Sequence, residues 1–135
     1  MKLNLGCGKD RLDGYENIDL IDGKKAFPLD YVEDGSCEEI RASHILEHFP
    51  FEDAYAVLAN WTSKLADGGT LKIAVPNFKR VAKNYLQGKQ QDTQRIVMGG
   101  HVDENDFHKA IYDIGSLTGL MESVGLKCIK EWDDY

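Results

Sequence analysis

The sequence predicts an α/β fold with a mainly parallel sheet and flanking helices, and three observations lead to that class. Short apolar runs typical of strands alternate with helical patterns through the second half of the chain. The 135 residues match the size of one domain, spanning 1–135. Glycines and polar residues directly follow several of the apolar runs, where parallel sheets place their ligands.

The first half of the chain contains three predicted strands. Residues 3–5 form the first strand and end at the turn that begins with Gly6. Residues 17–21 and 39–43 form the second and third strands. Only ten residues separate Gly6 from the second strand, about the length that a parallel connection needs by itself. We therefore expect the first helix to be shortened or absent.

The second half continues with a helix over residues 51–66, whose apolar side chains recur every three or four positions before Asp67-Gly68-Gly69. The elements that follow are a strand, a helix, a long polar segment, a helix and a final strand, over residues 70–75, 78–86, 88–110, 114–124 and 126–132. The sequence ends after this single strand, so we expect the last strand of the sheet to be missing and its edge to be open. Either a shortened chain or a homo-oligomer would account for such an edge.

The composition narrows the class of protein. A net charge of −7 makes a nucleic-acid partner unlikely, because binding phosphates requires clustered cations. The three cysteines are widely spaced, which favours a reducing compartment over a disulfide framework. No apolar run has the length of a signal peptide or a membrane span. These features predict a cytoplasmic protein with no membrane partner.

A glycine turn and an acidic residue predict a nucleoside ligand. Gly6-Cys7-Gly8 directly follows the first strand, and glycines there let the backbone approach a ligand closely. Asp19 lies in the second strand region, where a carboxylate can accept hydrogen bonds from both ribose hydroxyls. Together they indicate an adenosine-type ligand.

Five segments carry a resemblance to a known family: LNLGCG, NIDL, EEIRASHILEHF, LADGGTLKIAVPN and GLMESVGLKCIKEW. In this order they resemble a class I S-adenosylmethionine-dependent methyltransferase with a Rossmann-like fold, closest to a compact bacterial and phage-associated group. The resemblance covers nearly the whole chain. It implies S-adenosylmethionine as cofactor and S-adenosylhomocysteine as product.

The resemblance also implies roles for particular residues. The glycine turn would wrap the methionine part, the acid would hold the ribose, and a loop would flank the adenine. The strand-end residues after the third strand would line the methyl-donor side. The cofactor-binding residues implied in this way are Leu5, Gly6, Cys7, Gly8, Asp19, Leu29, Asp30, Ser43 and His44.

The shortened first helix leaves one role unfilled. The N-terminus of that helix normally helps to bind the carboxylate of the cofactor. We expect Lys9 or Arg11 to supply a cation in its place, although a solvated position explains both side chains equally well.

Residues 44–48 read H-x-x-E-H, a pattern that zinc peptidases carry on a helix. A strand leads into His44 and Pro50 follows closely, which leaves about one helical turn. That is too short to hold two zinc ligands and a general base, so we expect no metal here. His44 is then expected to face the pocket, while Glu47 and His48 cap or orient the next helix.

The polar segment 99–108 is a second candidate for chemistry. It contains two histidines and three acidic residues, and long loops of this kind commonly bind substrates. A flexible polar connection is the competing interpretation. The resemblance to the family favours catalytic roles for Asp106 and His108, alongside His44, because imidazole can take a proton near neutral pH.

The function predicted from the sequence is therefore methyl transfer from S-adenosylmethionine. The acceptor is unknown, with a small molecule, saccharide or protein favoured over nucleic acid. Two alternatives stay open: a module that binds the cofactor without catalysis, and a zinc hydrolase that uses residues 44–48.

Overall fold

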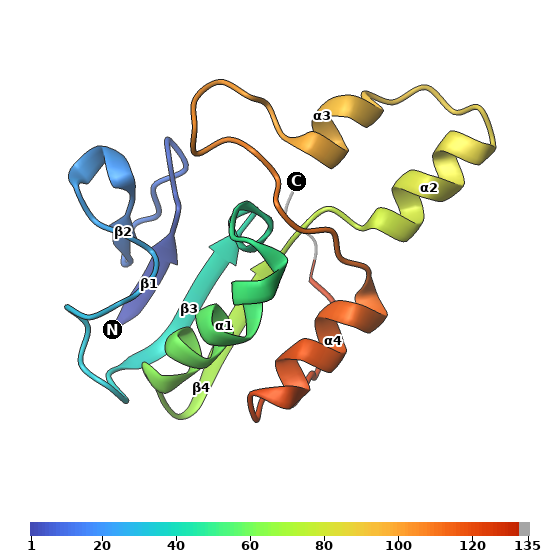
Figure 1. The fold of residues 1–135 in the computed structure, drawn as a ribbon. Helices are drawn as coiled ribbons and strands as arrows, with labels where there is room; N and C mark the ends of the chain where they lie inside the picture. Colours follow the sequence, from blue (N-terminus) through green and yellow to red (C-terminus); the bar gives the residue numbers. More distant parts are fainter. Residues whose placement is uncertain (133–135) are drawn as a thin grey trace.

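The computed structural model describes residues 1–132 and shows a Rossmann-like α/β fold (Figure 1). Four parallel strands form one sheet in the order β2-β1-β3-β4. The strands are β1 Lys2–Leu5, β2 Glu16–Ile18, β3 Cys37–Ser43 and β4 Leu65–Ala74. The parallel sheet that the sequence predicts is confirmed.

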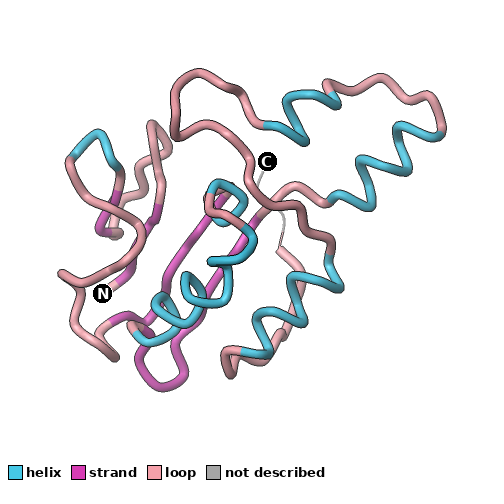
Figure 2. Tube along the Cα trace, in the orientation of Figure 1, coloured by secondary structure: helices cyan, strands magenta, loops and turns pink. Residues whose placement is uncertain are grey.

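Four α-helices and three 3-10 turns accompany the sheet in the described chain. The helices are α1 Ala54–Ser63, α2 Phe78–Leu86, α3 Thr93–Met98 and α4 Ile114–Ser123. The 3-10 turns are η1 Leu20–Asp22, η2 Leu46–His48 and η3 Phe51–Asp53. Helix α1 lies over β3 and β4, whereas α2 and α3 extend away from the sheet (Figures 1 and 2). No helix among residues 1–132 has the length and apolar character needed to span a membrane.

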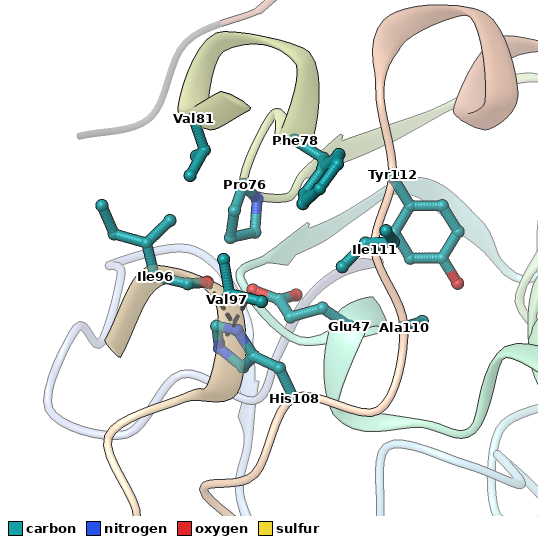
Figure 3. Close-up of a pocket in the computed structure, with 10 residues that line it drawn as sticks. All are labelled: Glu47, Pro76, Phe78, Val81, Ile96, Val97, His108, Ala110, Ile111 and Tyr112. Carbon is teal, nitrogen blue, oxygen red and sulfur yellow. Dashed lines mark hydrogen bonds and ion pairs between the residues drawn. The ribbon is translucent and has the colours of Figure 1, made fainter. Parts of the chain in front are cut away.

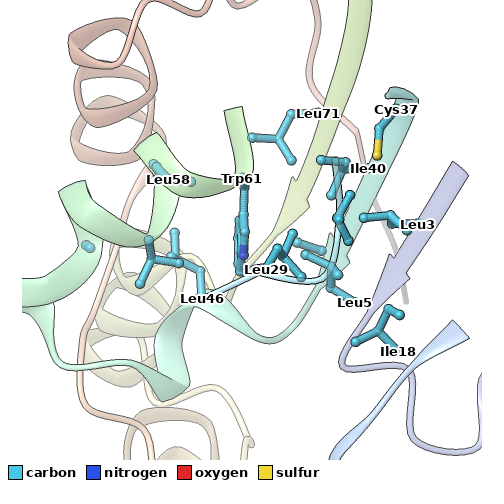
Figure 4. Close-up of a cluster of buried hydrophobic side chains, with 14 of the residues drawn as sticks. Leu3, Leu5, Ile18, Leu29, Cys37, Ile40, Leu46, Leu58, Trp61 and Leu71 are labelled. Carbon is cyan, nitrogen blue, oxygen red and sulfur yellow. The ribbon is translucent and has the colours of Figure 1, made fainter. Parts of the chain in front are cut away.

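One face of the sheet is apolar, because side chains alternate between the two faces along each strand. The parallel registers align Ile18, Leu5, Ala42 and Ile73 in one row across the four strands. Helix α1 covers this face with Ala54, Val57, Leu58 and Trp61. Figure 4 shows Leu58 and Trp61 of this helix in one cluster with Leu46 and Leu71.

The other face of the sheet is polar. The same registers align Asn17, Asn4, Arg41 and Lys72 in a row. The side chain of Asn4 is fully buried, and its Nδ2 donates to Asn17 Oδ1 and to the carbonyl of Asp10, both at 2.9 Å. Its Oδ1 accepts from Arg41 Nη1 at 2.9 Å.

The connection between β1 and β2 contains no helix, as the sequence predicts. Hydrogen bonds to asparagine side chains hold it instead. Asn17 Oδ1 accepts from the amide of Leu12 at 2.9 Å, and Asn4 binds the same loop at Asp10. The loop therefore lies against the polar face of the sheet, where it forms one wall of the groove described below.

Several predicted boundaries are wrong. Helix α1 ends at Ser63 and not at Ala66, because β4 already pairs at Leu65 and the Asp67-Gly68-Gly69 turn bulges out within that strand. Strand β2 ends at Ile18, because the Asp19 side chain accepts from the amide of Ile21 and starts a 3-10 turn. The polar segment 88–110 contains the short helix α3.

The predicted final strand over residues 126–132 does not form, so β4 is the last strand in the described chain. Lys130 interrupts the more apolar of the two alternating sides of this segment, and charged residues flank Ile129 on the other, so neither side is uniformly apolar. Ile129 is largely exposed. The Trp132 ring instead lies 5.5 Å from the Arg41 guanidinium, on the polar face of the sheet.

Candidate functional site

A groove of about 790 Å³ opens at the carboxyl ends of β1 and β3. Its lining residues are Leu5, Gly6, Cys7, Gly8, Lys9, Asp10, Arg11, Leu12, Arg41, Ser43 and His44. In the sheet, β2 lies on one side of β1, whereas β3 and then β4 lie on its other side. The groove therefore lies at the point where strand order reverses, which is where open parallel sheets bind ligands.

The glycine turn of the groove depends on its glycines. Gly6 and Gly8 have φ angles of 61° and 51°, in the left-handed region that side chains disfavour. A Cβ atom at Gly6 would overlap the Cδ1 atom of Ile45. The amide of Gly6 donates to the carbonyl of Ile18 at 2.8 Å, which fastens the turn to the end of β2.

Cys7 is buried within this turn, and burial raises the pKa of its thiol above the ordinary value. The protonated thiol is a poor nucleophile. Cys7 therefore forms part of the groove wall, consistent with the small size that a tight turn requires.

Asp19 holds the groove together from the end of β2. Its Oδ2 accepts from the amide of Gly8 at 2.8 Å, and its Oδ1 accepts from the amide of Ile21 at 3.0 Å. The side chain is half-buried. Each carboxylate oxygen has a second lone pair, so both can still accept from a ligand hydroxyl. Asp19 thus links the glycine turn to η1 and remains chemically suited to the predicted ribose contact.

Three cations contribute to the lining of the groove. Lys9 and Arg11 do so from the β1–β2 loop, and Arg11 is paired with Asp22. Arg41 is the third, and the sequence analysis did not assign it to the site. Strand alternation could have indicated it, because Arg41 lies two residues before Ser43 on the same face of β3.

Three of the predicted cofactor contacts, Asp19, Leu29 and Asp30, are not among the residues that line the groove, although Asp19 is bonded to Gly8 in its wall. Leu29 is fully buried in the apolar core, where its amide donates to Asn60 Oδ1 at 2.9 Å. Asp30 is exposed, and neither residue lines the groove. The structure therefore gives no support to contacts of Leu29 and Asp30 with the base.

His44 lies in the groove wall in an unusual conformation. Its φ angle is 54°, which is uncommon for a residue with a side chain and is frequent at functional sites. A hydrogen bond from its amide to the carbonyl of Ala74, at 2.7 Å, keeps it at the end of β4. Its Nδ1 lies 3.7 Å from Glu47 Oε2. Ser43 and His44 both line the groove.

Glu47 is the most unusual charged residue near the groove, because its side chain is 2 % exposed. The sequence predicts that Glu47 caps or orients the next helix, with substrate contact and the H-x-x-E-H zinc pattern as alternatives. The structure brings His108 to it from the distant 99–110 segment, with His108 Nε2 at 4.0 Å from Glu47 Oε2. The His48 ring packs edge-on against the His108 ring, with centroids 4.8 Å apart. The structure thus gathers one carboxylate and two imidazoles.

A small pocket lies beside this cluster, between η2, α2 and the segment before α4 (Figure 3). Glu47 and His108 form one wall, and Phe78 and Tyr112 lie on another side. Burial, together with the negative charge of Glu47, raises the pKa of the Tyr112 hydroxyl above its ordinary value. That hydroxyl therefore stays protonated at neutral pH.

Asp106 lies apart from both sites. Its Oδ2 accepts from the amide of Val102 at 3.2 Å, and its backbone carbonyl accepts from the amide of His101. These bonds close a turn within the loop that precedes His108. The structure therefore brings His108 to the cluster near His44 but leaves Asp106 in a local turn, and its predicted catalytic role stays a prediction.

Comparison with known proteins gives a likeness at the level of the fold. No family model matches the chain, and no curated protein sequence matches it. The structure is similar to the crystal structure of a SAM-dependent methyltransferase from Archaeoglobus fulgidus, with a TM-score of 0.61 and 19 % sequence identity. The match covers 93 % of this chain and 60 % of the other chain. The two proteins share a fold, and this chain corresponds to a little more than half of the other.

Proposed function

We propose that the protein is an S-adenosylmethionine-dependent methyltransferase. The observation that carries the proposal is the groove at the switch point of a parallel sheet, with the turn of Gly6 and Gly8 on one side and Asp19 behind it. The fold similarity to a SAM-dependent methyltransferase supports this choice among nucleoside-binding functions.

The groove residues fit the chemistry of this cofactor. Gly6 and Gly8 both line the groove and carry no side chains, so the backbone of the turn can approach a ligand closely. The lining combines the apolar Leu5 with the cations Lys9 and Arg41, which can attract the carboxylate of the methionine part. Asp19 offers lone pairs to the ribose hydroxyls. When bound, the cofactor supplies an electrophilic methyl group attached to a sulfonium.

The protein contributes mainly position to this reaction. The glycine turn and Asp19 would hold the cofactor along one side of the groove, and Ser43 and His44 would hold the acceptor at the other. Fixing both partners removes most of the entropy cost of the bimolecular step. The imidazole of His44 would accept a hydrogen bond from an acceptor O–H or N–H, and Glu47 behind it restricts its orientation.

A module that binds the cofactor without catalysis is the second candidate. The observation in its favour is the connection after β1, where hydrogen bonds to asparagines replace a helix and its N-terminal anion site. Such a module would bind the cofactor but release no S-adenosylhomocysteine with any acceptor. Turnover assays with small-molecule, saccharide and protein acceptors distinguish it from an enzyme.

The first experiment is calorimetric titration of the protein with S-adenosylhomocysteine. We expect saturable binding of one ligand per chain. Asp19→Asn removes the charge but keeps one oxygen acceptor, so the affinity should fall by about 10- to 100-fold, the cost of weakening charge-assisted hydrogen bonds.

The matched control for this experiment is Asp67→Asn. Asp67 is an exposed carboxylate in the turn near the amino end of β4, away from the groove at the carboxyl ends. This variant should bind like the wild type. Absence of binding to the wild-type protein would contradict the proposed function. Equal affinities of Asp19→Asn and Asp67→Asn would contradict the role of Asp19 but not the proposed function.

A further inference from the structure

We propose that Glu47, His48 and His108 form a binding site for one divalent transition-metal ion, with zinc as the ion best suited to the ligands. One ligand atom from each residue lies within 4.8 Å of the others. The site differs from the H-x-x-E-H pattern read from the sequence, because His108 takes the place of His44. It does not depend on the proposed methyltransferase function.

The set of side chains matches a known chemistry for zinc. Two imidazoles and one carboxylate are the protein ligands of zinc in several metalloenzymes, where the fourth position holds water or substrate. Hard ions such as Mg²⁺ and Ca²⁺ prefer oxygen ligands and would leave the imidazoles unused. The two imidazoles and one carboxylate therefore favour a transition-metal ion of intermediate hardness, such as zinc.

The tautomer of His108 is set in the way that a metal ligand requires. Its Nδ1 lies 3.0 Å from the carbonyl oxygen of Ile96 (Figure 3). A carbonyl oxygen can only accept, so Nδ1 carries the proton and the neutral ring has its lone pair on Nε2. That atom is the one that faces Glu47 Oε2 at 4.0 Å. Histidines that bind metals commonly donate their other ring N–H to a carbonyl in this manner.

Two buried polar atoms in the cluster have no hydrogen-bond partner, namely Glu47 Oε1 and His48 Nδ1. Burying such atoms without a partner is costly, and the carboxylate of Glu47 is the more expensive of the two. Its side chain is 2 % exposed, so bulk water does not compensate for its charge. A bound cation would satisfy both atoms and neutralise the carboxylate.

The distances between the three ligand atoms allow an ion to bind after the side chains move slightly closer together. Two atoms each about 2.0–2.1 Å from a tetrahedral zinc ion lie about 3.3 Å apart. His108 Nε2 and Glu47 Oε2 lie 4.0 Å apart, and the three ligand atoms lie within 4.8 Å of one another, so the side chains must move together by roughly 1 Å. The backbones are already held together, because the amide of Lys109 donates to the carbonyl of Glu47 at 2.7 Å. Binding would therefore fasten the 99–110 segment to η2.

The test is titration of the full chain with Zn²⁺ after removal of metal with a chelator. A Cys128→Ser background removes the exposed thiol, which is a competing zinc ligand. We expect binding of one ion per chain in calorimetry. Zinc at a hundredfold excess over its Kd should raise Tm by roughly 5–10 °C, because the ion binds the folded chain.

Two variants locate the site. His108→Ala removes one ligand, and Glu47→Gln keeps the shape of the side chain while removing its charge. Each should weaken zinc binding by at least ~100-fold, since even the partners of metal ligands contribute 10- to 100-fold. His101→Ala is the control, because this exposed histidine lies in the same loop outside the cluster and should leave the affinity unchanged.

Circular dichroism shows whether each variant is folded. If His108→Ala does not fold, the Glu47→Gln variant alone provides the test. One ion per chain, with affinity lost in the folded cluster variants and kept in His101→Ala, supports the site. Failure of the wild-type chain to bind zinc would overturn the proposal. So would equal affinities of the wild type and a folded cluster variant. Neither result bears on binding of S-adenosylhomocysteine, which is measured separately.

Discussion

Three residues that line the groove, Gly6, Gly8 and His44, have backbones in the left-handed region, and Gly6 and His44 reach this conformation for different reasons. Gly6 has no side chain, and the close approach of Ile45 leaves no room for one. His44 bears a side chain and adopts its φ of 54° at a strain cost of about 1–2 kcal/mol. The hydrogen bond from its amide to the carbonyl of Ala74 and the contact of its Nδ1 with Glu47 Oε2 hold it there. The positions of both residues thus derive from neighbours on other elements.

The Gly6→Ala variant tests the close packing of the turn. Its positive φ alone should cost about 1–2 kcal/mol of the free energy of unfolding, and displacing Ile45 should add about 1–3 kcal/mol. Gly35→Ala is the matched control, because Gly35 has a φ of 72° but open space around its Cβ position. Unfolding in urea measures both variants. Equal losses would show that Ile45 does not restrict position 6.

At the scale of the element, the side chains of Asp92 and Asp113 accept from the first amides of α3 and α4, whereas α1 and α2 begin without a side-chain cap. Helix α4 begins after Asp113, whose Oδ1 accepts from the amide of Ser116 at 2.8 Å, while Ser116 Oγ accepts from the Asp113 amide at 3.0 Å. This reciprocal pair is a capping box. The hydrogen bond from the Ser116 amide is the main cause that lowers the pKa of Asp113.

The Asp113→Ala variant should lower Tm at neutral pH by removing this cap. Because the pKa of the folded-state carboxyl lies below its ordinary value, the stabilisation is fully present above that ordinary value. It is lost as the pH falls through the lowered pKa. The Tm difference between wild type and variant should therefore shrink in acid, as measured by thermal scans across pH.

Glu122→Ala provides the control for Asp113→Ala. Glu122 is exposed near the other end of α4 and does not cap its first turn. Its Tm difference from the wild type should be small at neutral pH. A Tm difference for Asp113→Ala that stays constant down to the most acidic pH would contradict the proposed role of the ionised cap.

At the scale of the whole molecule, one apolar cluster joins the sheet to the helices and to the β2–β3 connection. Trp61 is fully buried in it, and its Nε1 donates to the carbonyl of Ala26 at 2.7 Å. Side chains of α4 pack against the same cluster. The opposite face of the sheet is polar and holds the loop that forms the groove. Stability and ligand binding thus rest on different faces of one sheet.

The Trp61→Phe variant tests whether this cluster stabilises the molecule as one unit. Loss of the indole N–H leaves the Ala26 carbonyl without that donor, so the free energy of unfolding should fall by about 1–3 kcal/mol. The near- and far-ultraviolet circular dichroism transitions should still coincide, as expected for one cooperative domain. Tyr55→Phe, on the exposed side of α1, should change stability little. If the near- and far-ultraviolet transitions of the wild type did not coincide, the cluster would not stabilise the molecule as one unit.

Local patterns in the sequence determined much of the fold. The helix over residues 78–86 matches α2, because it begins after a proline and has a clear polar face. The glycine turn and the short β1–β2 connection also followed from local spacing. Ser43 and His44 reached the groove because they directly follow a strand of a parallel sheet. These features depend on neighbours within a few residues along the chain.

Only the tertiary structure decided the features that depend on distant partners. Leu29 looked suitable for contact with a base, yet it packs in the core against elements that are remote in sequence. The 126–132 segment has strand-like composition, yet it forms no strand in the described chain, and the Trp132 ring lies beside Arg41 instead. His108 meets Glu47 because a long loop returns to the strand ends. Sequence spacing carries little information about such encounters, since they are determined by which surfaces remain to be buried once the sheet has formed.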